Sequence, residues 1–272
     1  MLYLASANGL RRSPVWDALI RLLEEAPLPL RALITGLIPA ALTTLGCTPV
    51  LLGAKLSEEA RDAGMGFAAG VMLVASFTSL LLPAVELGGA WMALAGFLLG
   101  AALIKLLDMA LPHMHLAKGY EGPRRTGRLG REWLIALAMI VHNVPEGMAV
   151  GAAASRDVMD GLLLGLAIGL QDVPEGLAVA LPLAAGGGRL VAFSVGALSG
   201  LSEALAALIP PLIVEHVSLA LPLMLALAAG AMVYVVVHEV VPEIYGHEHD
   251  EPSTLGFFAG FTAMLLLDTL LG

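Results

Sequence analysis

Two copies of one short polar motif carry the side chains in this sequence that are best suited to bind a metal ion. The first copy, HNVPEG, begins at His142, and the second, QDVPEG, begins at Gln171. The first and fifth residues of each copy are four apart, so on a helix they share one face, about one turn from each other. His142 with Glu146, and Gln171 with Glu175, therefore form two pairs of neighbouring ligands.

These four side chains supply one imidazole, one amide oxygen and two carboxylates. Such a set suits a borderline divalent metal, and zinc is favoured by the imidazole and the small number of ligands. Asn143 and Asp172 lie about 100° further round their helices. Glu203 is expected at a similar depth. With shared oxygens from Glu146 and Glu175, these three side chains could complete a second, harder site made only of oxygens.

The composition places the two motifs in a membrane protein. Of the 272 residues, 58% are hydrophobic and 14% are charged, and the mean hydropathy is +0.86. A bilayer core of roughly 30 Å takes about 20 apolar residues in a helix. Such runs predict an all-α bundle of eight spans, because a membrane barrel needs short segments of alternating polarity. The runs are approximately Ala32–Gly53, Gly64–Val85, Ala90–Pro112, Trp133–Ala154, Gly161–Ala185, Leu190–Val214, Leu219–Val241 and Thr254–Gly272.

The fourth and fifth of these spans must position the metal ligands. They are expected to be antiparallel neighbours, with each motif about ten residues from a helix end, which brings both pairs to mid-membrane. A carboxylate there costs about 2.5 to 3.5 kcal/mol even on lenient scales, so it is usually retained for function. Pro145 and Pro174 each remove one backbone hydrogen bond and are expected to kink their helices.

Structural roles are the alternative for each of these polar residues. A single buried His or Glu could be a structural hydrogen bonder, but a duplicated pair in adjacent spans argues against that reading. For Glu203 taken alone, a structural role stays open. Met72, in the second span, is interpreted as core packing, with a place on the entrance route as the alternative.

Charge asymmetry predicts the orientation of the chain. With an outer N-terminus, one side of the membrane collects eight Lys and Arg residues between Lys55 and Arg189, whereas the inter-helix loops of the other side hold only Arg156. The positive-inside rule makes the first side cytoplasmic. Both termini are then extracytoplasmic, in a multi-pass protein of the cell (inner) membrane.

Outside the spans, the sequence predicts a tail and a loop. Residues 1–30 form the tail, in which residues 15–28 are too polar to span and are interpreted as an amphipathic helix on the membrane surface. Residues 31–272 form the eight-helix bundle. The cytoplasmic loop at about 116–131 is basic and rich in Gly, so we expect a mobile backbone there.

Charge and cysteine content exclude several classes of partner. The net charge of −9 provides no basic surface for nucleic acid. Cys47 is the only cysteine, so an intrachain disulfide and thiolate-rich zinc or iron–sulfur sites are excluded. A bound metal must therefore use nitrogen and oxygen ligands. The sequence also has no phosphate-binding loop, which argues against direct coupling to ATP.

Two further groups of histidines could act on the cytoplasmic side. His238 and Glu239 come about nineteen residues, or close to 28 Å, after the outer start of the seventh span, which predicts a place near the exit and an exit-side metal relay. Ordinary interfacial polar residues are the alternative. His113 and His115 at the start of the basic loop suggest metal capture, or equally two solvated histidines.

The paired motifs, the eight spans and the His-bearing loop after the third span resemble the ZIP (Zrt-, Irt-like) family of divalent metal transporters. The Gln-Asp form of the second motif is similar to the bacterial GufA-like branch. The resemblance implies uptake into the cytoplasm without ATP, by alternating access in which spans one, four, five and six move against the others, commonly in a homodimer. It also implies a binuclear site. The primary metal would use His142, Glu146, Gln171 and Glu175, and the second Asn143, Glu146, Asp172, Glu175 and Glu203.

The motif departs from the family at one position, and this affects the expected cargo. Many relatives have His where this chain has Gln171. A neutral amide weakens the case for strict zinc selectivity and leaves Cd²⁺, Fe²⁺ and Mn²⁺ open beside Zn²⁺. Two other functions remain as alternatives. An intramembrane metalloprotease would need a His where Pro242 stands, and a proton-linked transporter of organic solutes would use Glu146 and Glu175 as a proton relay.

Overall fold

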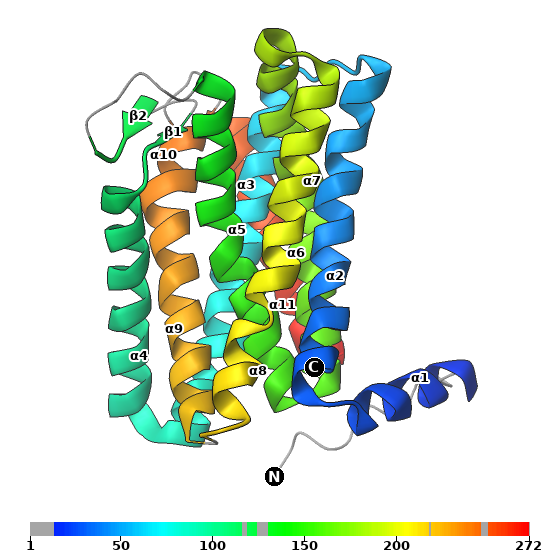
Figure 1. Cartoon of the computed structure of the whole chain (residues 1–272), viewed down its shortest axis with the longest axis vertical. Helices are drawn as coiled ribbons and strands as arrows, with labels where there is room; N and C mark the ends of the chain where they lie inside the picture. Colours follow the sequence, from blue (N-terminus) through cyan, green and yellow to red (C-terminus); the bar gives the residue numbers. More distant parts are fainter. Residues whose placement is uncertain (1–13, 116–118, 124–129, 218, 246–249, 272) are drawn as a thin grey trace.

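The chain folds into a bundle of helices (Figure 1), in agreement with the predicted fold class. The computed structural model describes residues 14–115, 119–123, 130–217, 219–245 and 250–271. The α-helices are α1 (Pro14–Glu25), α2 (Leu28–Cys47), α3 (Glu58–Ala75), α4 (Leu82–Ala110), α5 (Arg131–Arg156), α6 (Val158–Gly187), α7 (Arg189–Ala206), α8 (Ile209–Val214), α9 (Ala220–Val235), α10 (Val241–Ile244) and α11 (Asp250–Leu271).

Seven helical segments of the described chain are long and apolar enough to cross a membrane. The longest, Glu58–Ala110, has 53 residues, roughly 80 Å of helix, more than twice the thickness of a bilayer core. Gly89 interrupts it with φ 77° and ψ 164°, a conformation that favours glycine. The segments on either side have different neighbours, because α3 packs along α11 and α4 along α9. The count of eight crossings stays a prediction.

Three spans contain irregular turns. A 3₁₀ segment, η1 (Thr48–Leu52), ends the first, and the π-helical segments η2 (Ser76–Leu81) and η3 (Val236–Val240) continue α3 and α9. The predicted sixth span, Leu190–Val214, matches the apolar segment Arg189–Val214, within which the helix is interrupted. The helix α7 ends at Ala206 and α8 begins at Ile209, because the two prolines that follow Ile209 cannot continue the backbone hydrogen bonds of α7.

The loop after α4 contains a short hairpin. The strands β1 (His113–His115) and β2 (Gly119–Glu121) pair in antiparallel register, with His113 opposite Glu121. The sequence predicted a mobile backbone for residues of about 116–131; β2 is a strand within this range, and mobility stays a prediction. The register matters for chemistry because it places the side chains of His113 and Glu121 at the same level.

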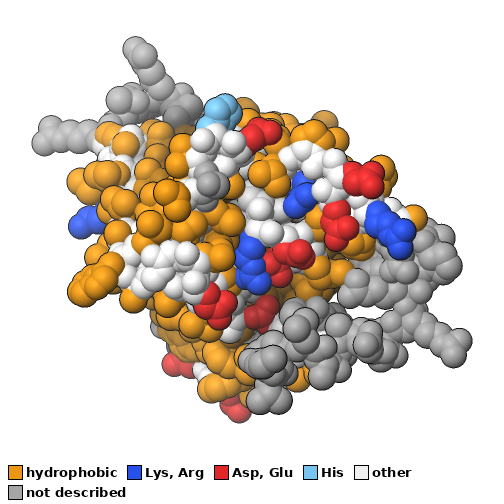
Figure 2. Space-filling view, turned by 90° about the horizontal axis from the view of Figure 1, so that it is seen from below, with side chains coloured by type: hydrophobic (Ala, Val, Ile, Leu, Met, Phe, Trp, Pro, Cys, Tyr) orange, Lys and Arg blue, Asp and Glu red, His pale blue; other side chains and the backbone are white. Residues whose placement is uncertain are grey.

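The helix α1 projects sideways from the lower end of the bundle (Figure 1). Arg31 at the start of α2 holds its end, since its guanidinium donates from Nε to the Leu23 carbonyl at 3.2 Å and from Nη2 to the Glu24 carbonyl at 2.8 Å. These carbonyls lack partners within a helix that stops at Glu25. Figure 2 shows this end of the molecule, where acidic side chains gather beside a broad hydrophobic area. That α1 lies in the membrane surface stays a prediction.

Within each of two sets of helices, the backbones of neighbouring helices are in close contact. At Gly147 of α5, the Cβ atom of any larger residue would collide with the Glu203 carbonyl oxygen of α7. At Gly200 of α7, such a Cβ atom would lie only 2.5 Å from the Ala40 carbonyl oxygen of α2. In the other set, a Cβ atom at Gly66 of α3 would meet a carbonyl oxygen of α11. Small residues allow such close approach. The helices α2, α5, α6 and α7, which carry both motifs and Glu203, are therefore held tightly against one another.

Candidate metal centre

The two motifs meet crosswise where α5 and α6 pack side by side. The helices are joined only by Asp157, so they run antiparallel. His142 Nε2 of α5 lies 2.9 Å from Glu175 Oε1 of α6. In the opposite direction, Gln171 Nε2 of α6 donates to Glu146 Oε1 of α5 at 2.6 Å. All four predicted ligands of the primary position are buried, and the structure brings them together.

The second predicted set lies beside the first. Glu203 Oε1 accepts hydrogen bonds from Asn143 Nδ2 and, at 2.9 Å, from Thr43 Oγ1. The same hydroxyl lies 3.2 Å from Asp172 Oδ2. Glu146, Asp172 and Glu203 each offer one oxygen, and these oxygens lie within 4.8 Å of one another. The structure therefore brings together the residues of the predicted all-oxygen position.

One oxygen of each carboxylate faces a donor, and the other has none. The partnered oxygens are Glu146 Oε1, Asp172 Oδ2, Glu175 Oε1 and Glu203 Oε1. Among the described residues, the second oxygens have no hydrogen-bond partner, namely Glu146 Oε2, Asp172 Oδ1, Glu175 Oε2 and Glu203 Oε2. A buried acceptor without a partner costs free energy. Glu146 lies in a group with His142 and Glu175 and in a second group with Asp172 and Glu203, and the ligand atoms within each group lie within 4.8 Å of one another, so a divalent cation can satisfy such oxygens.

Glu239, which the sequence predicted near the exit, is in contact with this cluster. Its Oε2 lies 3.4 Å from His142 Nδ1, and the side chain is buried. The prediction measured depth along the seventh span alone. The chain stays helical to Ile244, so Glu239 lies more than one turn inside the bundle and faces α5.

His238 lies in a separate group with Asp108, His113 and Glu121. Its Nε2 is 3.8 Å from Asp108 Oδ2 and 3.8 Å from Glu121 Oε2. Adjacent residues of a helix differ by about 100° in direction, so His238 and Glu239 serve different groups. A carboxylate oxygen from Asp108, another from Glu121 and a nitrogen of His238 lie within 4.8 Å of one another, close enough to hold a metal ion.

The structure corrects the view of His113 as a solvated loop residue. It is fully buried, its Nδ1 lies 2.8 Å from the Leu111 carbonyl oxygen, and its Nε2 lies 3.6 Å from Asp108 Oδ1 and 3.7 Å from Glu121 Oε2. The backbone of His115 forms the end of β1, opposite Gly119, but its side chain lies outside the described residues.

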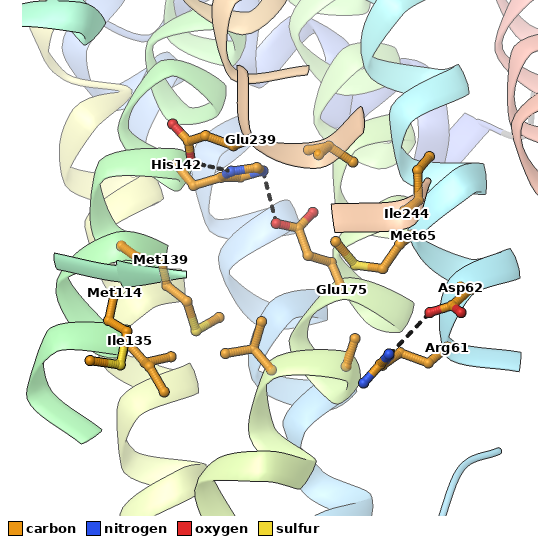
Figure 3. A pocket seen from close by; sticks show the side chains of 14 residues that line it. Arg61, Asp62, Met65, Met114, Ile135, Met139, His142, Glu175, Glu239 and Ile244 are labelled. Carbon is orange, nitrogen blue, oxygen red and sulfur yellow. Dashed lines mark hydrogen bonds and ion pairs between the residues drawn. The ribbon is translucent and has the colours of Figure 1, made fainter. Parts of the chain in front are cut away.

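A cavity lies next to His142, Glu175 and Glu239 (Figure 3). Its farther side is formed by Arg61 and Asp62, whose Nε and Oδ1 atoms are 3.2 Å apart, and its wall includes several methionines. Met72 is not among the lining residues, and its side chain is fully buried in the hydrophobic core. In this conformation Met72 packs in the core; a role on the entrance route stays a prediction.

Comparison with known proteins agrees with this geometry. The sequence profile of the family described as ZIP Zinc transporter matches residues 115–268, which contain both motifs and Glu203. The chain belongs to the ZIP family. It is 44% identical to the Zinc transporter ZIPB of Bordetella bronchiseptica, over 89% of this chain and 81% of that protein.

Other members of the ZIP family are nearly as similar. Identity is 37% to the Zinc transporter GufA of Myxococcus xanthus, over 88% of this chain and 98% of that protein. Identity to the human Zinc transporter ZIP11 is 32%, over 85% of this chain and 94% of that protein. ZIP proteins are multi-pass membrane transporters and not enzymes, so the metalloprotease alternative is wrong. Metal transport, and not transport of an organic solute, is the function of the family.

Sequence reasoning missed three residues that contact the predicted ligands or form a further group. Asp108 lay inside a predicted span, so the rule that flagged Glu146 would have found it too. Glu121 could be found only from the hairpin register. Thr43 gave no signal, because threonine is unremarkable in an apolar helix.

Proposed function

We propose that this ZIP-family protein moves Zn²⁺ across the cell membrane into the cytoplasm, without ATP, through a binuclear site. Zinc is the substrate. The observation that carries the proposal is the set of unpartnered oxygens of Glu146, Asp172, Glu175 and Glu203 next to the imidazole of His142. The relatives compared above are all named zinc transporters, which supports the same cargo.

The primary position uses His142, Glu146, Gln171 and Glu175, and the second uses Asn143, Glu146, Asp172, Glu175 and Glu203. At Gln171 an uncharged amide stands where many relatives have the nitrogen ligand of a His, so the primary position has only one imidazole. A transported ion must be held loosely enough to leave, and a mixed nitrogen and oxygen set also admits Cd²⁺, Fe²⁺ or Mn²⁺.

The proposed direction of transport, into the cytoplasm, is supported by the charge pattern of the loops and by the position of the cavity beside the site. It is lined by Arg61 of α3, Met114 of β1 and Ile135 of α5, and β1 lies at the end of the bundle away from α1 (Figure 1). This is the end that collects Lys and Arg in the loops, so it is cytoplasmic and both termini are extracytoplasmic. The metal leaves through this cavity, and Asp108, His113, Glu121 and His238 bind it near the exit.

Alternating access fits the packing of the helices. All the proposed ligands lie on one set of helices, α2, α5, α6 and α7. The backbones of these helices pack closely against one another, so the set can move as one body against α3, α4, α9 and α11. The contact between His142 and Glu239 joins the two sets. A homodimer, as the family resemblance implies, would anchor the set that does not move.

The proposal is tested by measuring zinc uptake into proteoliposomes, with a zinc-sensitive dye trapped inside them. Glu146→Gln keeps the shape of the side chain but removes a charge from both positions, and it should abolish the flux. Glu59→Gln, a change of an exposed carboxylate on α3, is the matched control and should transport at the wild-type rate. If Glu146→Gln and Glu59→Gln gave equal zinc flux, the proposed metal site would be rejected.

A further inference from the structure

Thr43 is the point at which α2 contacts the second metal position. The side chain is buried, with an exposed fraction of 2%. Its Oγ1 lies 2.9 Å from Glu203 Oε1 of α7, 3.2 Å from Asp172 Oδ2 of α6 and 2.9 Å from the Pro39 carbonyl oxygen of its own helix. One hydroxyl thus touches carboxylates from two different helices.

Counting protons shows what this hydroxyl can do. A threonine hydroxyl donates one hydrogen bond, while an ionised carboxylate can only accept. Thr43 therefore donates to one acceptor at a time, and rotation about its C–O bond directs the proton to Glu203 Oε1, to Asp172 Oδ2 or to the Pro39 carbonyl oxygen. Glu203 Oε1 has a second donor in Asn143. Within the described part of the chain, Asp172 Oδ2 has Thr43 alone.

The contacts also distinguish the two oxygens of each carboxylate. Thr43 engages Oε1 of Glu203 and Oδ2 of Asp172, and the partner-free oxygens are Oε2 and Oδ1 of the same side chains. Each carboxylate is thereby held so that it presents one oxygen. A carboxylate that is free to turn can present both, which suits larger cations with more oxygen ligands.

We propose that Thr43 is a positioning residue of the second metal position, which holds Asp172 and Glu203 so that each gives one oxygen to the ion. It sets both the occupancy of that position and the preference between zinc and larger divalent ions. This inference rests on the proposed function, because it assumes that two metals bind.

If Thr43 served only to pack α2, its variants would behave differently from what a positioning role predicts. Threonines inside helices commonly bond the carbonyl four residues earlier, and Thr43 does so with Pro39. In Thr43→Val the shape is kept and the hydroxyl is lost, while in Thr43→Ser the hydroxyl is kept. Thr35 offers a matched control. It is a fully buried threonine of the same helix whose hydroxyl bonds the carbonyls of Arg31 and Ala32.

The test measures bound zinc per protein and the ratio of zinc to manganese uptake, on the same purified full-length variants. A hydrogen bond to a charged group contributes enough that its loss should raise the Kd of the second metal roughly tenfold. Bound zinc should then fall from about two toward about one per chain at intermediate zinc. In Thr43→Val the uptake ratio should shift toward manganese. Thr43→Ser and Thr35→Val should resemble the wild type.

Three outcomes overturn the inference, and they are distinguishable. If Thr43→Val binds two zinc ions with wild-type affinity and selectivity, Thr43 only packs. If Thr35→Val shows the same loss, the effect belongs to the helix and not to the site. If the wild-type protein itself binds no zinc and Glu146→Gln has no effect, the proposed function fails first. Should Thr43→Val not fold, Thr43→Ala removes the same hydroxyl, and rescue by Thr43→Ser decides the question.

Discussion

His142 on α5 and Glu239 on η3 are in contact through Nδ1 and Oε2, at 3.4 Å, although 97 positions separate them in the chain. The other ring nitrogen, Nε2, faces Glu175 at 2.9 Å. One imidazole therefore links a proposed ligand of the primary position to the helix that lines the cavity. In metal sites, a carboxylate on the second nitrogen of a histidine fixes the ring and makes it a stronger ligand.

This arrangement predicts the effect of Glu239→Gln. The amide keeps the size of the side chain but loses the charge that supports the ring, so zinc affinity should fall about ten- to hundredfold. Titration of the purified variant with zinc measures it. Glu215→Gln, a change of an exposed carboxylate, serves as the control. Unchanged affinity in a folded Glu239→Gln protein would mean that the contact with His142 has no role in binding.

The shared carboxylates should be more sensitive than the unshared ligands. Glu146→Ala or Glu175→Ala removes a charge from both positions and should abolish flux in protein that reaches the membrane. His142→Ala removes the nitrogen ligand and should reduce zinc flux more than manganese flux. In Glu203→Ala the primary position is intact, so bound zinc should fall from about two to about one with transport retained.

Metal stoichiometry and uptake on the same preparations distinguish these effects. Samples are compared at equal amounts of folded protein, with Glu59→Gln as the control for handling. The assignment of the primary position would be wrong if Glu203→Ala bound no metal while His142→Ala bound and transported normally.

The meeting of the two motifs could be predicted from the sequence because it depends on local geometry. The spacing of four between His142 and Glu146 fixes one helix face, and the repeat at Gln171 and Glu175 in the next span supplies the partner face. A one-residue connection at Asp157 leaves the two helices antiparallel. These facts are local, so no knowledge of the remaining fold was needed.

The contacts of Glu239, His113 and Thr43 could not be predicted in the same way, because they depend on which helices are neighbours. Position along a single span says how deep Glu239 lies but not which helix it faces. The burial of His113 depends on the hairpin of β1 and β2, in which Gly119 begins β2 and Gly122 follows it, with φ angles of 85° and 95°. Thr43 reaches the site only because α2 packs at backbone distance from α6 and α7.

Acidification should weaken uptake. The proposed ligands are imidazole and carboxylate groups, and each must be free of protons before it can bind metal. Lower pH adds protons that compete with zinc, so the apparent KM should rise as pH falls. The measurement is initial uptake rate against zinc at several values of pH, with the membrane potential clamped and pH equal on both sides. Uptake that keeps rising as pH falls would favour a proton-driven mechanism instead.

The proposed orientation can be tested by labelling single cysteines. Glu59 at the start of α3 and Glu215 between α8 and α9 are exposed, and they lie at opposite ends of the bundle. In a background with Cys47→Ala, Glu59→Cys should react with an impermeant reagent only after the cytoplasmic side is opened. Glu215→Cys should react in intact cells. Labelling of both from one side would contradict the topology.

The group formed by Asp108, His113, Glu121 and His238 should affect the release of metal more than its binding in mid-membrane. The ions counted in the binuclear site do not contact these side chains in the proposed arrangement. Asp108→Asn combined with His238→Ala should therefore leave about two zinc ions bound per chain while slowing turnover. Replacing His113 and His115 together should change the rate modestly.

The difference between binding and release is measured by comparing zinc titrations with the rate at which preloaded protein gives zinc to a chelator on the cytoplasmic side. A variant at an exposed histidine, His216→Ala, controls for loss of surface ligands. If Asp108→Asn with His238→Ala lost all zinc binding in folded protein, the exit group and the binuclear site would be one functional unit. If release stayed at the wild-type rate, the ion would leave by a route that avoids these side chains, along the cavity wall beside Arg61 and Asp62.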